Sequence, residues 1–282
     1  MISVVQLGTV DYATGLRLQQ HLVELHKQER IGDVLLLLEH APVITLGRNA
    51  KSKNLIATPE FLACRGVELF DCDRGGDVTF HGPGQLVGYP IFDLRTFPAG
   101  NSKRNHLGAL DYVRGLEEAL IRTCADFGIP AKRVAGLTGV WIEANLLSAE
   151  QKSSLANFSV KSKKLASDPC EAKIAAIGVH ISRGVTSHGF ALNVNTDLSY
   201  FDLIVPCGIA DKRVTSMKRE LNREINLLEV AHAVTRNFGT VFQTQILWLQ
   251  SLDDLLGQNL GVPMRVPENV RRIRHEDDST WA

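Results

Sequence analysis

The feature that most constrains the fold is residues 67–94, VELFDCDRGGDVTFHGPGQLVGYPIFDL. Short apolar and aromatic runs there are interrupted by glycine and proline, which is typical of several strands joined by turns rather than of a helix. Similar strand patterns occur at VAGLTGVWIE and KIAAIGVHISRGVTSHGFALNV. DVLLLLEH and VITLGR predict two further strands, separated by a tight turn at Ala41 and Pro42. The chain is therefore built around a sheet.

Helical periodicity separates these strand groups. Apolar residues recur every three or four positions in residues 11–30 and, most strongly, in residues 105–128, where Cys124 falls on the apolar face. A short helix is expected in TPEFLACRG, with Thr58 as its N-cap, and a last helix at residues 227–242. Strand groups followed by helices predict an α+β fold, an α/β sandwich in which helices pack on a largely antiparallel or mixed sheet.

Length and composition limit the domain organisation. The 282 residues, 44% of them hydrophobic, suffice for one substantial core, so we expect one main domain over residues 1–245. Residues 145–172 are rich in serine and lysine and lack periodicity, which predicts a flexible insertion between two strands. Residues 246–282 are expected to add a C-terminal helix and a polar tail.

Charge and hydropathy argue against several classes of protein. Lys plus Arg and Asp plus Glu both number 31, so no overall basic field favours nucleic acid or a membrane surface as a partner. The longest uninterrupted apolar run, residues 34–38, is far shorter than the roughly 20 residues of a membrane helix. The N-terminus lacks the features of a secretory signal, and we expect a cytoplasmic protein. Five widely spaced cysteines without a Cys-x-x-Cys pair indicate neither a disulfide framework nor structural zinc.

The densest candidate site is residues 74–85, RGGDVTFHGPGQ. Five of its twelve residues are Gly or Pro, and they surround one arginine and one histidine. Glycine lets backbone N–H groups approach a carboxylate, a phosphate or an oxyanion, so the segment is interpreted as a binding loop, although ordinary hairpin turns would have the same glycine content. It matches neither G-x-G-x-x-G nor G-x-x-x-x-G-K-[ST], and therefore indicates neither a dinucleotide site nor a P-loop.

Cys207, in IVPCGI, and Lys173, at the start of KIAAIGV, are candidate catalytic residues. A free cysteine is most often a small buried apolar residue, and a lysine at this position is most often a solvated strand end. The alternative is that the ammonium lies against the thiol, lowers the thiol pKa and later receives a proton. Three histidines could act with this cysteine, either as zinc ligands or in a Cys–His hydrolase: His81, His180 and His188. No close ligand spacing supports a metal site.

Four motifs, taken together and in order, resemble the lipoyl(octanoyl) transferases, which move an octanoyl group from acyl carrier protein to a lysine of a lipoyl domain: RGGDVTFHGPGQLVGYPIFDL, GVW, KIAAIGVHISRGVTSHGFALNV and IVPCGI. The resemblance covers roughly residues 1–245 and implies the fold of biotin and lipoate protein ligases. It implies that Cys207 is the acyl-thioester nucleophile and that Lys173 is its activating partner. It also implies a set of substrate-binding residues, namely Arg74, Gly75, Gly76, Asp77, Val78, Thr79, Phe80, His81, Ala176, Ile177, Gly178, Gly189, Phe190 and Ala191.

The resemblance further implies the partners. The expected donor is octanoyl acyl carrier protein, and the expected acceptors are lipoyl domains of 2-oxoacid dehydrogenase complexes and the glycine cleavage H protein. Because the passage from thioester to amide is downhill, no ATP, metal or other cofactor is expected. Two alternatives stay open: an ATP-dependent lipoate or biotin ligase of the same fold, and a non-catalytic acyl-binding module with an inert thiol.

Overall fold

The computed structural model describes residues 1–98, 106–143, 171–206 and 213–256. Cys207, most of the expected insertion and most of the expected tail lie outside these residues. The described elements, in chain order, are β1 (Ile2–Val10), α1 (Tyr12–Lys27), β2 (Asp33–His40), β3 (Val43–Leu46), η1 (Ser52–Asn54), α2 (Pro59–Cys64), β4 (Glu68–Asp71), β5 (Val78–His81), β6 (Gln85–Ile91), η2 (Leu94–Thr96), α3 (Ala109–Asp126), β7 (Ala131–Val134), β8 (Leu137–Glu143), β9 (Glu171–Ser182), β10 (Val185–Asn193), η3 (Leu198–Leu203), β11 (Arg213–Val214), α5 (Met217–Leu221), α6 (Leu227–Val241), β12 (Ile246–Leu249) and α7 (Leu252–Leu256).

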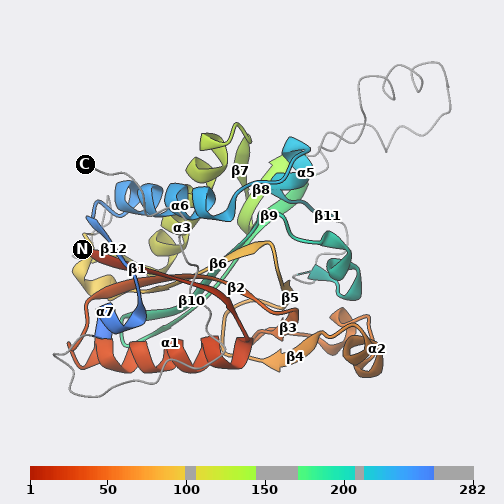
Figure 1. Ribbon diagram of the computed structural model, residues 1–282, viewed down its shortest axis with the longest axis horizontal. Helices are drawn as coiled ribbons and strands as arrows, with labels where there is room; N and C mark the ends of the chain where they lie inside the picture. Colours follow the sequence, from red (N-terminus) through yellow and green to blue (C-terminus); the bar gives the residue numbers. More distant parts are fainter. Residues whose placement is uncertain (99–105, 144–170, 207–212, 257–282) are drawn as a thin grey trace.

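A mixed sheet runs through the centre of the molecule (Figure 1). Its strand order is β12-β1-β2-β6-β10-β9-β8-β7, and β11 pairs with β9 outside this path. The pairs made by β1 are parallel, whereas every pair from β2 to β7 along that order is antiparallel. A smaller sheet has the order β4-β3-β5. The expected largely antiparallel, mixed sheet is therefore confirmed.

Two strands separated by a tight turn would suggest a hairpin. The turn at Ala41 and Pro42 does not close one. β2 lies in the large sheet between β1 and β6, whereas β3 pairs with β4 and β5 in the small sheet. The chain therefore crosses from one sheet to the other at this turn. A local pattern predicts that a segment is extended, but its partners are selected by side-chain packing with distant residues.

Besides the short β11 and most of β7, the sequence-based prediction lacks β1 and β12. They pair with each other in parallel through residues 2–5 and 246–249, so the large sheet continues beyond residue 245, the expected end of the main domain. Glu171 and Ala172, expected at the end of the insertion, belong instead to β9. The structure thus extends the ordered sheet at both of these expected boundaries.

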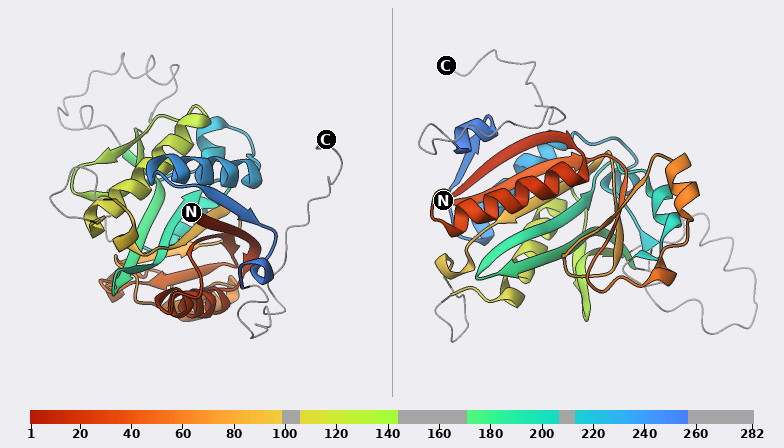
Figure 2. Two further views of the ribbon diagram at one scale, coloured as in Figure 1. Left: turned by 90° about the vertical axis from the view of Figure 1, so that its left-hand side faces the viewer. Right: turned by 90° about the horizontal axis from the view of Figure 1, so that it is seen from below.

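Helices cover both faces of the large sheet (Figures 1 and 2). α3 and α6 lie side by side on one face, and α1 lies on the other. The core beneath α3 and α6 contains completely buried side chains such as Tyr112, Leu116 and Phe238. Cys124 is also completely buried there, and burial raises the pKa of its thiol to about 12, which confirms its expected place in the core. No described helix is both long and apolar enough to cross a bilayer.

Helix α1 places its first residue beside the functional site described below. Asp11 is the N-cap, and its carboxylate accepts a hydrogen bond from the backbone N–H of Thr14 at 2.8 Å. Leu18 and Leu22 then pack on the sheet face opposite to α3 and α6. Because the helix begins at Tyr12, that aromatic ring is held at the edge of the small sheet, 5.3 Å from the ring of Phe70.

Candidate active site

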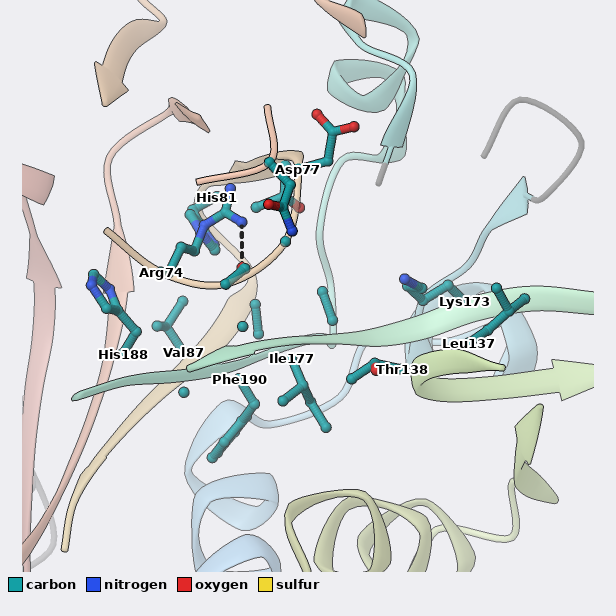
Figure 3. Close-up of a pocket in the computed structure, with 18 of the residues that line it drawn as sticks. Arg74, Asp77, His81, Val87, Leu137, Thr138, Lys173, Ile177, His188 and Phe190 are labelled. Atoms are coloured by element: carbon teal, nitrogen blue, oxygen red, sulfur yellow. Dashed lines mark hydrogen bonds between the residues drawn. The ribbon is translucent and has the colours of Figure 1, made fainter. Parts of the chain in front are cut away.

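A cavity of about 350 Å³ lies between the large sheet and the small sheet (Figure 3). β6, β9 and β10 supply one wall, and β5 with the loop before it supplies the opposite wall. The turn between β7 and β8 closes the end that contains Leu137 and Thr138. Cavities of this size hold small ligands.

Twelve of the fourteen predicted substrate-binding residues line this cavity: Arg74, Gly75, Gly76, Asp77, Thr79, His81, Ala176, Ile177, Gly178, Gly189, Phe190 and Ala191. Val78 and Phe80 do not line it. Side chains alternate along a strand, so these two point to the other side of β5 and belong to the core of the small sheet. There the Phe80 ring stacks on Tyr200 with the ring centroids 4.7 Å apart. Val78 and Phe80 therefore support the strand from behind rather than face a ligand.

Arg74 contributes a buried positive charge to the cavity wall. Its side chain donates hydrogen bonds to the carbonyl and hydroxyl oxygens of Thr45 at 2.7–3.1 Å and to the carbonyl of Gly75 at 3.2 Å. These acceptors are neutral, and no carboxylate of the described residues forms an ion pair with Arg74. A guanidinium is always protonated in proteins, so Arg74 is a permanent positive charge in this wall, which Asp77 also lines.

Gly178 allows the loop at residues 74–76, which carries Arg74, to pack directly on β9. A Cβ atom at Gly178 would lie 2.7 Å from the carbonyl oxygen of Gly75 and 3.4 Å from Cδ of Arg74. The same approach lets the Gly75 N–H donate to the Val179 carbonyl at 3.0 Å. A larger side chain here would push the loop off the strand and change the width of the cavity.

A chain of hydrogen bonds connects His81 to the strand that carries Lys173. His81 Nδ1 lies 2.8 Å from Oε1 of Gln85, whose Nε2 donates to Oδ1 of Asn193 at 2.9 Å. Nδ2 of Asn193 donates to the Thr215 carbonyl at 3.0 Å, and the Thr215 N–H donates to the Lys173 carbonyl at 2.9 Å. With this amide orientation, His81 carries its proton on Nδ1, which leaves a lone pair on Nε2. Gln85 and Asn193 had no assigned role, although each is a polar residue within an apolar strand.

The aromatic and imidazole groups at one end of the cavity are uncharged at neutral pH. His40 Nδ1 donates to the Val10 carbonyl at 2.7 Å, and its Nε2 accepts a hydrogen bond from the Tyr89 hydroxyl at 2.5 Å. Burial lowers the pKa of His40 to about 4 and that of His81 to about 3. Burial also raises the pKa of Tyr12 and of Tyr89 above the ordinary value of a phenol. The imidazoles are therefore neutral, and so are the phenols.

His188 lies at the same end of the cavity (Figure 3). Its Nε2 is 2.7 Å from a carboxylate oxygen of Asp73, and its backbone N–H donates to Oε1 of Gln19 at 2.7 Å. Burial lowers the pKa of His188, although the Asp73 carboxylate acts in the opposite direction. These contacts hold the His188 ring and backbone in place. Among the described residues, no three His, Cys, Asp or Glu side chains are arranged to hold a metal ion.

Lys173 lies at the opposite end of the cavity from His188, beside Leu137 and Thr138 (Figure 3). It is only 8% exposed, so the interpretation as a solvated strand end is wrong. Its Nζ is 4.7 Å from the centre of the Trp141 ring, a cation–π distance. A buried ammonium is costly, and it is retained here at the wall of a ligand-sized cavity.

The described residues on both sides of position 207 lie beside Lys173. Pro206, directly before Cys207, lines a small cavity together with Lys173. After the gap, β11 pairs in parallel with β9 so that Val214 lies opposite Lys173. Cys207 itself lies outside the described residues, and its proximity to Lys173 stays a prediction.

Nine further residues line the cavity, of which the sequence had singled out only His188: Tyr12, Asn49, Lys51, Val87, Tyr89, Gly136, Leu137, Thr138 and His188. They come from the start of α1, the loop after β3, β6, the β7–β8 turn and β10. The GVW motif, one of the four motifs of the resemblance, lies in β8. The residues just before it supply three of the nine cavity residues: Gly136, Leu137 and Thr138. The loop after β3 and the start of α1 carry no such signal, because only the tertiary fold brings them to the cavity.

Comparisons with known proteins identify the family. A family model described as the lipoyl protein ligase A/B catalytic domain matches residues 11–239. An octanoyltransferase of Koribacter versatilis (strain Ellin345) is 58% identical, covering 99% of this chain and 98% of its own. An octanoyltransferase of Acidobacterium capsulatum is 56% identical over 91% of this chain and 96% of its own. The chain belongs to the lipoyl protein ligase A/B catalytic domain family.

Solved structures agree on the fold. The lipoate protein ligase of a bipartite lipoylation system from Thermoplasma acidophilum matches with a TM-score of 0.61 at 16% identity and covers 92% of each chain. A lipoate-protein ligase A bound with ATP matches with a TM-score of 0.59 at 15% identity, covering 92% of this chain and 94% of its own. The predicted family and the predicted α+β fold are both confirmed, and the sequence relatives confirm the predicted class of enzyme, an acyltransferase.

Proposed function

We propose that this protein transfers an octanoyl group from acyl carrier protein to a lysine of a lipoyl domain by way of a thioester on Cys207. Octanoyl transfer is the activity named for its relatives at 56–58% identity. The route through Cys207 rests mainly on one observation. The buried ammonium of Lys173 lies at the end of the cavity where the residues flanking position 207 also lie.

The ammonium suits the first step of this route. A thiolate is the attacking species, and an ordinary thiol, with a pKa of about 8.5, is only a few per cent ionised at pH 7. A positive charge beside Cys207 lowers the thiol pKa and raises that fraction. The Cys207 sulfur attacks the thioester carbonyl of the donor, a new carbon–sulfur bond forms, and the bond to the carrier sulfur breaks. The carrier thiolate leaves and is protonated, so one thioester replaces another.

The second step uses the same lysine as a proton acceptor. The acceptor lysine has a reference pKa of about 10.4, so it arrives as an ammonium and must lose a proton before it attacks. Its nitrogen then attacks the acyl carbonyl, an amide bond forms, and the bond to the Cys207 sulfur breaks. Lys173, neutral after passing its own proton to the leaving carrier thiolate in the first step, takes up this proton directly or through water. The second proton, which the nitrogen loses as the amide forms, passes to water. The thiolate and the ammonium are both restored.

The cavity fits an eight-carbon chain. Eight carbons in a zigzag are as long as the backbone of roughly three extended residues, about 10 Å. From Lys173 to Gly178 the cavity wall follows β9 for five residues, or roughly 16 Å. Ala176 and Gly178 of β9 line this path, and Ala191 of β10, which pairs with Ala176, lines it as well. Burying six methylenes there supplies on the order of 5 kcal/mol before ordering costs.

The partners follow from the family and the chemistry. Protein substrates that carry lipoyl domains suit a member of this family, and the Thermoplasma acidophilum ligase is described together with its own E2 lipoyl domain. The finer proposal takes acyl carrier protein as the donor, and lipoyl domains of 2-oxoacid dehydrogenase complexes and the glycine cleavage H protein as acceptors. We place the reaction in the cytoplasm, without a cofactor.

Intact-mass analysis after incubation with octanoyl acyl carrier protein tests the route. We expect the wild type to gain one octanoyl group, the adduct to map to Cys207, and a lipoyl domain to remove it. Cys207→Ala should form no adduct and transfer no octanoyl group, whereas Cys64→Ala, which changes an exposed cysteine, should behave like the wild type. ATP-dependent transfer of free octanoate by Cys207→Ala would identify a ligase instead. Binding without any adduct would identify a non-catalytic acyl-binding module.

A further inference from the structure

A β-bulge turns Lys173 toward the cavity. On β8 and β9, Trp141 pairs with Lys173 and Val140 pairs with Ala175, so Ile174 is an extra residue on β9. With regular alternation, Lys173 and Ala176 would face opposite sides of the sheet. Both line the cavity, and the extra residue accounts for this. Bulges often re-aim side chains next to active sites.

Two residues of β8 then receive the turned side chain. Lys173 and Trp141 are directly opposite across the two strands, and Nζ lies 4.7 Å from the indole centroid. At Gly139, where φ is 118°, a Cβ atom would lie 3.4 Å from Cε of Lys173 and 2.7 Å from the Ala175 carbonyl oxygen. The glycine therefore leaves room for the lysine stem, and the indole face covers the ammonium.

The position of β8 is itself fixed by α3. Glu117 is completely buried, and its carboxylate accepts a hydrogen bond from the Gly139 N–H at 3.1 Å. Three carboxylates on the elements around Lys173 form ion pairs with nitrogen–oxygen distances of 2.6–3.7 Å. Glu117 pairs with Arg114 and Arg133, and Glu143 and Glu171 pair with Lys132. On β11, the exposed Arg213 pairs through its backbone with Ala172. The indole face adds a cation–π attraction for the Lys173 side chain in this buried place.

We infer that Trp141 and Gly139 form a seat for the Lys173 ammonium, and that Trp141 is a positioning residue for the reaction at that end of the cavity. The seat is a property of the fold, whereas its effect on catalysis rests on the proposed function. Because loss of the indole would let the ammonium move away from the thiol, we expect the thiolate fraction of Cys207 to fall by about tenfold, which is one unit of its pKa.

The first experiment detects the seat without using the thiol. In the protein labelled with ¹³C-lysine, the ring current of Trp141 should shift the ε-methylene signal of Lys173 upfield, and Lys173→Gln assigns the signal by removing it. We expect the shift to persist in Val140→Ala, which changes a buried core neighbour on the same strand, and to vanish in Trp141→Leu. A wild-type Lys173 signal at the position of a solvated lysine would overturn the inference.

The second experiment measures the consequence. The alkylation rate of the Cys207 peptide is followed by mass spectrometry from pH 5 to pH 9. Trp141→Leu should slow alkylation at pH 7 by about tenfold, and Trp141→Phe, which keeps a ring, should restore most of the rate. In a Lys173→Gln background, Trp141→Leu should add nothing. An equal loss in both backgrounds would mean that Trp141 acts only through folding, and would overturn the inference.

The two proposals fail in different ways. If Cys207 forms no octanoyl thioester while the upfield lysine signal is present, the proposed route is wrong and the seat stands. If the thioester forms and the upfield signal is absent, the seat is wrong and the route stands.

Discussion

The two ends of the cavity deal with burial in opposite ways. At the Lys173 end, the fold holds a buried ammonium against the face of Trp141. At the His188 end, burial lowers the pKa of the imidazoles of His40 and His81 and raises that of the Tyr89 phenol, so these groups stay neutral. The Lys173 end therefore places a charge where a thiol can be ionised. At the other end, which we call the neutral end, the imidazoles and phenols add no charge to that of Arg74.

The comparison also shows what maintains each end. At the Lys173 end, a bulge turns the lysine toward the cavity and an aromatic ring contacts its ammonium. The neutral end depends on a hydrogen-bonded pair in which His40 joins the Val10 carbonyl to the Tyr89 hydroxyl. Changes at the first end should therefore affect catalysis, and changes at the second end should affect stability and chain selection.

The largest effect is expected at the charged end. Lys173→Gln should lower the rate of acyl transfer at pH 7 by about 100-fold or more, because it removes both the charge that activates the thiol and the proton acceptor. Initial rates with octanoyl acyl carrier protein and a lipoyl domain provide the measurement. The free energy of unfolding, measured in urea, should not fall, since a buried ammonium is costly to keep. A rate within twofold of the wild type would remove Lys173 from the mechanism.

At the neutral end, Val87→Phe should change chain selection. Val87 is buried and lines the cavity near His188 (Figure 3), so a larger ring shortens the space for the chain terminus. We expect the rate with octanoyl thioester to fall by about tenfold, and the rate with hexanoyl thioester to fall less. Val87→Ala should move the preference toward decanoyl. Equal losses for all chain lengths in Val87→Phe would show that the chain does not reach this end.

The neutral histidines predict that stability falls in mild acid. The unfolded chain binds a proton at His40 with a pKa of about 6.5, whereas the folded protein binds it only near pH 4, so the contribution is full above pH 6.5 and is lost as the pH falls toward 4. Between pH 7 and pH 5 the loss is roughly 2 kcal/mol for this group. Urea unfolding at both pH values should show a smaller difference for His40→Gln than for the wild type. An unchanged difference would mean that His40 is not the group that titrates.

The smallest effect is expected for Tyr89→Phe, which tests whether the phenol at the neutral end contributes to stability or to catalysis. Tyr89→Phe removes the hydroxyl that donates to His40 and should lower the free energy of unfolding by about 1 kcal/mol, because a buried acceptor loses its partner. Tyr200→Phe, at a half-exposed ring, serves as the control and should change stability less. Octanoyl transfer should stay within twofold of the wild type in both variants. A tenfold loss of activity in Tyr89→Phe would instead give the phenol a part in the chemistry.

Local pattern predicted the helices well. The expected helix at residues 227–242 is observed at Leu227–Val241, and the expected cap at Thr58 accepts a hydrogen bond from the Phe61 N–H at 3.3 Å. Such features depend on residues a few positions apart, which the sequence displays directly. β1 and β12 escaped prediction, because their pairing joins the two ends of the described chain.

The sequence predicted those parts of the candidate site that lie in glycine-rich segments. It did not predict which side chains of those segments face the cavity, because packing determines that. Motif resemblance selected the stretch from Arg74 to His81, but only alternation along β5 separated Thr79 and His81, which face the cavity, from Val78 and Phe80, which do not. Trp141 stood within a recognised motif without an assigned role. Its role became visible only when strand pairing placed it opposite Lys173.

The sequence by itself determined the family, the helices and the glycine-rich segments that contact one another across the cavity, because these depend on residue type and short spacing. The tertiary structure alone decided which side each residue faces. One extra residue at Ile174 brings Lys173 to the cavity side, and burial against Trp141 sets the surroundings of its charge. The physical reason is that strand register and desolvation are set by neighbours distant in the chain, and no local pattern contains them.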